Sequence, residues 1–161
     1  MTLDNCIITN NLNYLMTKKL ILKNVPGSAN IGVSYGYTLE EVYIENLLGS
    51  IYQLGIGNCP ALKKITIPGG TYTYNIVLGD SCPKLEEIVL NSGVVFSGDA
   101  LIIVSHSTTF TSEKIVSLFN SLPTKSSGTR TIYISSAQNN SLTSAQRLIA
   151  TNKGWTITVQ G

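Results

Sequence analysis

The sequence contains a repeat that returns every 23 residues, and this limits what the chain can fold into. The segment Thr38–Ile44 aligns with Ala61–Ile67, which in turn aligns with Lys84–Leu90, at an offset of 23 residues in both steps. A weaker copy, Thr17–Leu22, precedes them. Such repeats are typical of chains that stack one unit on the next, because a single unit cannot bury its apolar face alone. The repeat therefore predicts a solenoid.

Each copy ends in a stretch where apolar and variable residues alternate, which predicts a β-strand with one face buried. Stacked copies would form a parallel sheet of about four rungs. One buried column is expected from Leu20, Val42, Ile65 and Ile88, and a second from Leu22, Ile44, Ile67 and Leu90. Because a period of about 20 to 29 residues is typical of leucine-rich repeats, the fold class expected is α/β, a leucine-rich-repeat-type solenoid.

Charged residues in the repeat change sign from one copy to the next. The two equivalent positions hold Lys18 and Lys19, then Glu40 and Glu41, then Lys63 and Lys64, then Glu86 and Glu87. Opposite charges on neighbouring strands stabilise the pairing by about 0.2 to 1 kcal/mol, and like charges destabilise it. The alternation therefore predicts strands stacked in register. The alternative is that these residues are solvated charges of an exposed face, since helix faces also alternate.

The C-terminal part of the chain has a different pattern. Ser112–Leu122 predicts a helix with Thr111 as its N-cap and Pro123 as its stop. Its apolar face would comprise Ile115, Val116, Leu118, Phe119 and Leu122. A strand is expected at Thr131–Ile134.

A second helix is expected to begin at a capping box formed by Thr143 and Gln146 and to end at Gly154. It is expected to bury Ala145, Leu148 and Ile149, and Trp155, Ile157 and Val159 then alternate as a last strand. We therefore expect a solenoid over residues 1–110, closed by a β-α-β-α-β-like cap over residues 111–161 in the same structural unit. A cap shields the last rung from water and from pairing with another sheet edge.

The segment Asn58–Pro68 resembles the BspA-like leucine-rich repeat, which typically reads Cys, two small or polar residues, Leu, two polar residues and Ile-x-Ile-Pro. Cys82–Leu90 is a second match, and the resemblance extends over residues 17–93. It departs from the family at Tyr37, which replaces the proline. The usual Phe before the Cys is also missing, so the resemblance does not predict the structure of the convex side of each coil. Leu142–Thr156 is similar to the closing element that often follows such repeats in gut-bacterial surface proteins and bacteriophage structural proteins.

No catalytic, cofactor or metal site is expected. Gly32–Gly36 fits the G-x-S-x-G pattern, and Ser34 could be combined with Asp80 or Asp99 and the single histidine, His106, into a triad. A nucleophile elbow needs a helix after the serine, whereas a repeat strand is predicted there, so a Gly-rich turn is favoured. His106 has no second histidine beside it and follows an apolar run in a loop-like stretch, which disfavours a metal ligand.

Three cysteines, Cys6, Cys59 and Cys82, are an odd number without a C-x-x-C pair, which argues against a zinc site and a disulfide framework. Cys59 and Cys82 occupy equivalent repeat positions, so a disulfide between them is one alternative. A buried column of reduced cysteines is favoured. Asn139–Ser141 is a formal glycosylation sequon, to which we give little weight without a secretory signal.

The eight tyrosines are the feature that points to a binding surface, since tyrosine offers apolar area and a hydroxyl at small entropic cost. The candidate binding residues are Tyr43, Thr66, Tyr72 and Tyr74. Strand alternation points Tyr43 away from the core, in an exposed strip with Ile21, Thr66 and Val89. The favoured alternative is that most tyrosines pack the convex side of the coils.

Composition excludes several classes of function. Hydrophobic residues make up 43% of the chain and charged residues 12%, which excludes disorder. The net charge of +2 is not gathered into a basic tail or helix, so no nucleic-acid partner is expected. The longest apolar run, Ala100–Val104, is far shorter than the roughly 18 residues of a membrane span, so no membrane insertion is expected.

The resemblance implies a non-enzymatic structural or binding protein. BspA-like repeats occur in bacterial surface adhesins, usually with a signal peptide, and in phage tail or fibre proteins, which lack one. Residues 1–13 show no signal peptide, so we expect a complete chain made in the cytoplasm and favour a virion component, a tail, fibre or capsid decoration. Its partners would be other virion subunits or a host cell-surface glycan or protein, with further copies of the chain as another candidate. The alternative is a bacterial adhesin or protein-interaction module at the cell surface.

Overall fold

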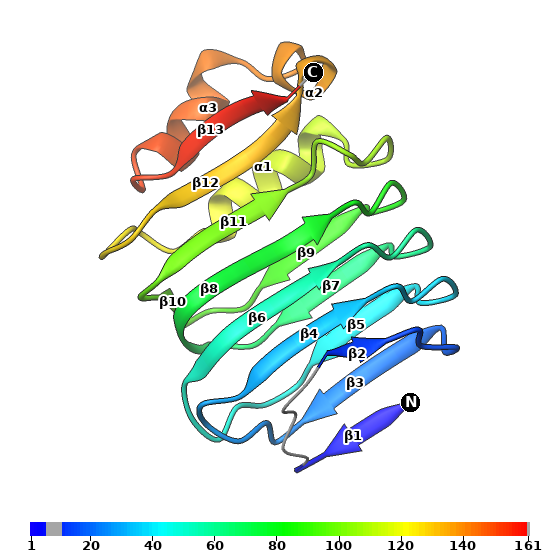
Figure 1. Ribbon diagram of the computed structural model, residues 1–161. Helices are drawn as coiled ribbons and strands as arrows, with labels where there is room; N and C mark the ends of the chain where they lie inside the picture. Colours follow the sequence, from blue (N-terminus) through cyan, green and yellow to red (C-terminus); the bar gives the residue numbers. More distant parts are fainter. Residues whose placement is uncertain (6–10, 161) are drawn as a thin grey trace.

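The computed structural model describes residues 1–5 and 11–160 and shows an α/β chain with two parallel sheets, of five and eight strands (Figure 1). The chain passes from one sheet to the other and back through the repeat. The five-stranded sheet has the order β1 (Thr2–Asp4), β3 (Lys19–Lys23), β5 (Glu41–Ile44), β7 (Lys64–Ile67) and β9 (Glu87–Leu90). The prediction of an α/β chain with a parallel sheet is confirmed, and four of these strands are those that the repeat predicts.

The eight-stranded sheet was not predicted. In spatial order it contains β13 (Thr156–Gln160), β12 (Arg130–Ser135), β11 (Asp99–Ile103), β8 (Gly70–Asp80), β6 (Ile51–Gly57), β4 (Asn30–Ser34) and β2 (Leu12–Asn13), with β10 (Val94–Phe96) also paired with β8. Ile31, Leu54, Ile76 and Ala100, from four successive strands of this sheet, are buried. The apolar core therefore lies between the two sheets, and the opposite face of the eight-stranded sheet is free to carry polar side chains.

The strands of the five-stranded sheet stack in the predicted register. Lys19 pairs with Glu41, Glu41 with Lys64, and Lys64 with Glu87. The two predicted columns, Leu20, Val42, Ile65, Ile88 and Leu22, Ile44, Ile67, Leu90, are buried throughout. This arrangement confirms that equivalent residues of successive repeats lie directly above one another.

The predicted charge ladder forms as ion pairs. Lys19 Nζ lies 2.7 Å from Glu41 Oε2, and Lys64 Nζ lies 2.6 Å from Glu87 Oε2. Glu40 lies between two lysines, with Nζ of Lys63 at 2.8 Å and Nζ of Lys18 at 3.3 Å. The hydrogen bond from Lys63, with a further one from Lys18, lowers the pKa of the Glu40 carboxyl. The charges are thus paired across strands.

Helices close one end of the stack. Helix α1 (Ser112–Ser121) has Thr111 as its N-cap, buries Ile115, Leu118 and Phe119, and packs against β9. It covers the outer edge of the five-stranded sheet in place of a further strand, which protects that edge from unwanted pairing. Strands β12 and β13 instead continue the eight-stranded sheet from β11, so the C-terminal elements share a sheet with the repeat.

The second predicted helix is α3 (Ser144–Thr151), which begins at the capping box of Thr143 and Gln146 as predicted. A short helix that was not predicted, α2 (Ser136–Asn140), precedes it. The predicted buried face of α3 is wrong, because Ala145 and Leu148 are exposed and Ile149 is half-buried. Ala150 is buried instead. With so short a helix at the end of the stack, only the side turned toward its neighbours is covered.

A buried arginine joins the repeat to the cap. Arg130, only 2% exposed, donates hydrogen bonds to the carbonyl oxygens of Phe96, Gly98 and Thr129. Its guanidinium also lies 5.7 Å from the centre of the Phe96 ring. Burial lowers the pKa of this guanidinium. The Phe96 ring in turn meets the edge of Trp155, whose indole N–H donates to the Pro123 carbonyl at 2.8 Å.

No helix within residues 1–5 and 11–160 has the length and apolar character needed to cross a membrane.

Replacing Arg130 with methionine is expected to lower the free energy of unfolding by roughly 2–4 kcal/mol, because buried carbonyl groups lose their donors. Urea unfolding followed by circular dichroism measures this. Arg147→Met is the matched control: Arg147 also donates to backbone carbonyls, but it is less buried, so water replaces it and a smaller loss is expected. Equal losses of unfolding free energy in the two variants would contradict the assignment of Arg130 as the donor to buried carbonyl groups.

Replacing Glu87 with glutamine is expected to reduce stability at neutral pH by at most about 1 kcal/mol, as is usual for exposed pairs. The hydrogen bond from Lys64 holds the pKa of Glu87 below its ordinary value, which is about 4.3. The stabilisation is therefore complete above that pH and is lost as the pH falls below it. Urea unfolding across this range should show the difference between wild type and E87Q shrinking on acidification and in high salt; a constant difference would refute the ion pair's role.

Candidate functional site

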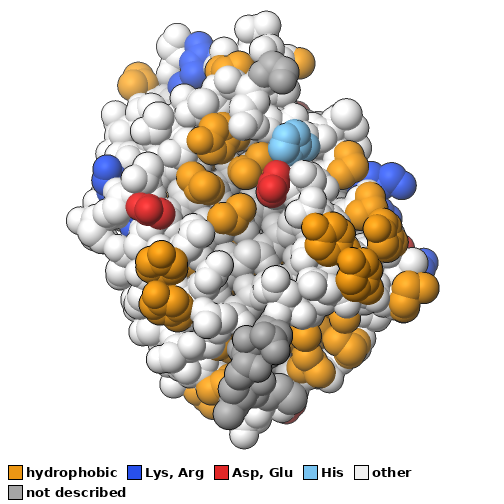
Figure 2. Space-filling model, in the orientation of Figure 1, with side chains coloured by type: hydrophobic (Ala, Val, Ile, Leu, Met, Phe, Trp, Pro, Cys, Tyr) orange, Lys and Arg blue, Asp and Glu red, His pale blue; other side chains and the backbone are white. Residues whose placement is uncertain are grey.

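The outer face of the eight-stranded sheet contains a hollow of about 240 Å³. Its lining comes from neighbouring strands and includes Asn30, Gly32, Ser34, Gln53, Gly55 and Asn58. Figure 2 looks onto this face, where Lys and Arg side chains lie around the margin and not over the centre. The border of the hollow is therefore made mostly of uncharged polar side chains, with Val77 and the carboxylate of Asp80 also in the lining.

Glycines make this hollow. Gly32 pairs with Gly55 across β4 and β6, so two adjacent outward positions carry no side chain. A Cβ built on Gly55 would meet no atom within 4 Å, which shows that the space above it is open. Gly32, unlike Gly55, is covered, because the Asn11 side chain lies where its Cβ would be.

A row of polar side chains crosses the sheet beside the glycines. Asn30 is in register with Gln53, Gln53 with Asn75, and Asn75 with Asp99. Neighbouring strands are about 4.8 Å apart, so the row repeats at that interval. A second hollow lies along the same row and is lined by Tyr74, Asn75 and Asp99 among others. The row thus extends the candidate site across four strands.

Two stacked tyrosine pairs stand at the two ends of these strands. Tyr52 and Tyr74 precede Gln53 and Asn75, and their rings are parallel within 1° with centres 4.9 Å apart. They are 45% and 56% exposed. Both rings therefore present apolar area directly beside the polar row.

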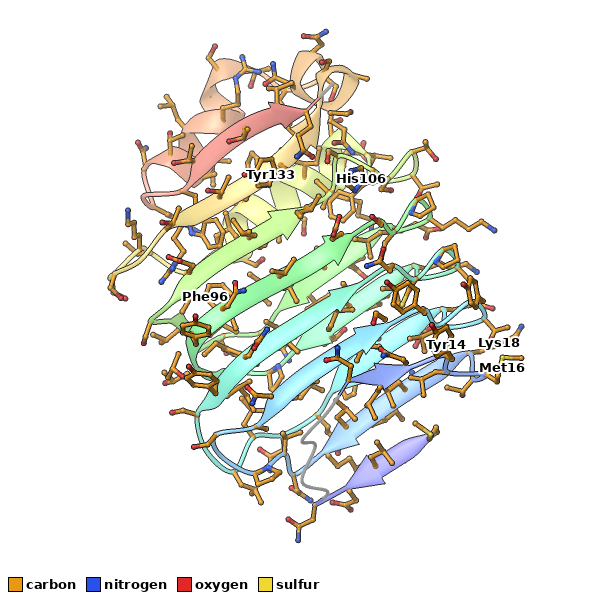
Figure 3. The ribbon with its side chains drawn as sticks, in the orientation of Figure 1. Tyr14, Met16, Lys18, Phe96, His106 and Tyr133 are labelled. Atoms are coloured by element: carbon orange, nitrogen blue, oxygen red, sulfur yellow. The ribbon has the colours of Figure 1, made fainter. Side chains whose placement is uncertain are left out.

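The second pair, Tyr14 and Tyr35, follows the far ends of β2 and β4, with ring centres 5.5 Å apart (Figure 3 labels Tyr14). Both residues have left-handed backbone, with φ of 57° and 56°. Few bulky residues adopt this conformation, which costs roughly 1 to 2 kcal/mol. The turn is held by stacked backbone hydrogen bonds, such as that from the Tyr35 N–H to the Asn58 carbonyl at 3.1 Å.

The four candidate binding residues predicted from the sequence, three tyrosines and Thr66, do not form one cluster. Thr66 is only 5% exposed, so the predicted exposed strip on the five-stranded sheet is wrong: the larger side chains of Tyr43 and Val89, its partners in register, flank it. Tyr43 itself is half-buried. Tyr72 is buried and its hydroxyl donates to the Pro68 carbonyl at 3.1 Å, which removes it from the candidate binding residues.

Tyr74 alone of these four lies on the candidate face. Simple alternation would place Tyr72 and Tyr74 on one face, but the pairing of β6 with β8 shifts register between Ile51 and Gln53. The irregularity turns Tyr74 outward while Tyr72 points into the core. A binding role for Tyr43 or Tyr74 remains a prediction.

The residues of the conceivable triad are not assembled. Ser34 Oγ donates to Asn13 Oδ1 at 2.7 Å, while His106 Nδ1 accepts the Ser81 N–H at 3.1 Å and lies 3.4 Å from Asp80 Oδ1. Ser34 ends β4 and the next element is β5, so no helix follows it. Within the described ranges, no three His, Cys, Asp or Glu side chains gather where they could hold a metal ion.

Cys59 and Cys82 are buried free thiols. Cys59 Sγ donates to the Gly57 carbonyl at 3.2 Å, and Cys82 Sγ donates to the Asp80 carbonyl at 3.3 Å. Burial raises the pKa of both thiols, that of Cys82 to about 12. The predicted reduced column is confirmed for these two residues, and Cys6 lies outside the described residues.

Sequence reasoning missed the polar row and the glycine floor, although a signal for them existed. Asn30-Ile31-Gly32 and Gln53-Leu54-Gly55 are related by the same 23-residue offset as the strands of the other sheet. Extending the repeat alignment into this second half of the period would have found them.

Alkylation with iodoacetamide at mildly alkaline pH is expected to modify Cys59 and Cys82 slowly in the native protein, because the thiolate is the reactive form and both groups are buried. Denaturation in guanidinium chloride without reductant should make both fully reactive. Peptide mass spectrometry distinguishes them from Cys6. Cysteines that become reactive only after reduction would instead indicate a disulfide.

Searches for related proteins find no matching family model, no similar curated protein and no similar solved structure. The resemblance to BspA-like leucine-rich repeats therefore rests on the sequence motifs of this chain.

Proposed function

We propose that the protein is a non-enzymatic binding protein that works through the outer face of the eight-stranded sheet. The observation that carries this proposal is the glycine-floored hollow with its polar row and the adjacent Tyr52–Tyr74 stack. Binding sites combine concavity with a few placed polar groups, and exposed tyrosines are typical of binding surfaces. The hydrogen bonds of Ser34 and His106 go to different partners, which supports binding over catalysis.

The finer assignment of the fold is part of the same proposal. The chain is a leucine-rich-repeat-type solenoid of the BspA-like kind, in which each 23-residue coil contributes one strand to each sheet. The recurrence of Leu39, Leu62 and Leu85 supports it, since all three are buried at equivalent positions before a strand of the five-stranded sheet. In this assignment the eight-stranded sheet forms the convex side of each coil, whose structure the resemblance did not predict.

The biological setting follows from the resemblance. The protein is a component of a bacteriophage virion, a tail, fibre or capsid decoration, that contacts the host surface or neighbouring virion subunits. Support comes from the closing element Leu142–Thr156, which is similar to that of phage structural proteins. Location on a bacterial cell surface, as an adhesin, is the alternative outcome of the test below.

Phage particles purified from a culture that produces this chain should bind an antibody raised against it, and gold-labelled negative-stain images should show the label at one defined part of the particle. Particles lacking the gene product serve as the control. If the label decorated bacterial cells and never the particles, the adhesin alternative would replace the virion assignment.

A further inference from the structure

The side-chain amides of the polar row are unused within the protein. Among residues 1–5 and 11–160, the side chains of Asn30, Gln53 and Asn75 make no hydrogen bond to another group. Each amide offers two donors and an acceptor oxygen with two lone pairs. A sugar hydroxyl donates one hydrogen bond and accepts two, so a row of amides matches a row of hydroxyls.

The charge of the site restricts the ligand further. The hollows are lined by Asp80 and Asp99 and by no lysine or arginine. An anionic ligand, such as a nucleic acid or an acidic polysaccharide, would meet two carboxylates in the lining and no lysine or arginine there. A neutral ligand has no such penalty.

Aromatic stacking provides the apolar part of the recognition. Tyr52 and Tyr74 form a stacked, half-exposed pair at the start of the polar row, in which each ring has one face against the other and its second face turned away from the stack. The face of an aromatic ring is electron-rich and attracts partially positive groups. The C–H groups on one face of a pyranose ring are of this kind, so a sugar can pack against tyrosine while its hydroxyls reach the amides.

A protein ligand fits the surface less well. The cores of protein interfaces are apolar and take large anchor side chains into desolvated pockets. The centre of this hollow is instead glycine backbone bordered by Asn30, Gln53 and Asn58. A hollow bordered by amide side chains beside a stacked tyrosine pair suits an oligosaccharide.

We propose that this hollow binds a neutral oligosaccharide of the host cell surface, which lies across β4, β6 and β8. Asn30, Gln53 and Asn75 form hydrogen bonds with its hydroxyls, and the Tyr52–Tyr74 stack packs against one sugar ring. The proposal rests on the proposed binding function and names the class of ligand.

Gly55→Val provides a sharp test because it fills the hollow without disturbing the fold. The new side chain meets no neighbour within 4 Å at its Cβ. Valine also favours strands, whereas glycine inside a strand weakens it, so the thermal stability of G55V should equal or exceed that of wild type. A loss of binding in this variant cannot then be attributed to unfolding.

The full chain should be applied to a printed array of neutral and acidic oligosaccharides, and the strongest neutral hit measured by isothermal titration calorimetry. We expect binding to neutral glycans only, with G55V and Tyr74→Ala each reducing affinity by roughly tenfold or more, which corresponds to about 1.4 kcal/mol. Tyr37→Ala removes a tyrosine that is as exposed as Tyr74 but lines neither hollow, so it is the matched control and should bind as wild type.

Three outcomes would overturn the proposal: no binding to any glycan, binding to acidic glycans alone, or affinity unchanged in both G55V and Y74A. These results are separable from failure of the proposed function. Particles that carry the antibody label while the array stays blank would refute the ligand class and leave the virion assignment standing. Glycan binding by a chain that is absent from the particles would refute the virion assignment and leave the ligand class standing.

Discussion

In-register stacking of parallel strands is the constraint on which the rest of the structure depends. Each strand of the repeat lies beside its equivalents one period away, so apolar residues such as Val42 and Ile65 meet others of their kind and form continuous columns. The lysine–glutamate ladder outside them is exposed and contributes little energy by itself. Its main effect is on register, because a slip by one residue would turn the columns outward and bring the charges inward.

This constraint explains which parts of the fold could be predicted. Strands β3, β5, β7 and β9 follow from alternation and charge, since both signals recur at the repeat period. The second sheet carries the same period but no charged marker, and glycines such as Gly32 and Gly55 weaken its strand signal. Helix α1 was predictable because its cap and apolar face are local features, whereas the buried face of α3 depends on what packs against it.

The candidate site was harder to predict because it depends on departures from regularity. Alternation places Tyr72 and Tyr74 together, and only the register shift opposite Ile51 separates them. Thr66 follows alternation correctly and is still covered by its neighbours in register. The burial of Arg130 runs against the usual exposure of charged residues, and it is explained by the carbonyl groups that this side chain satisfies.

Stacking also converts a periodic sequence into a periodic surface. Any outward position that recurs in successive repeats becomes a row across the sheet, with neighbours about 4.8 Å apart. On the five-stranded sheet such a row carries alternating charges that form ion pairs with each other, so these polar groups already have partners within the protein. On the eight-stranded sheet the equivalent row carries Asn30, Gln53 and Asn75, whose side chains make no hydrogen bond with one another or with any other described residue. The same register therefore pairs the charges of one face and leaves hydrogen-bonding groups of the other face directed at solvent, and this difference suits the second face to a ligand.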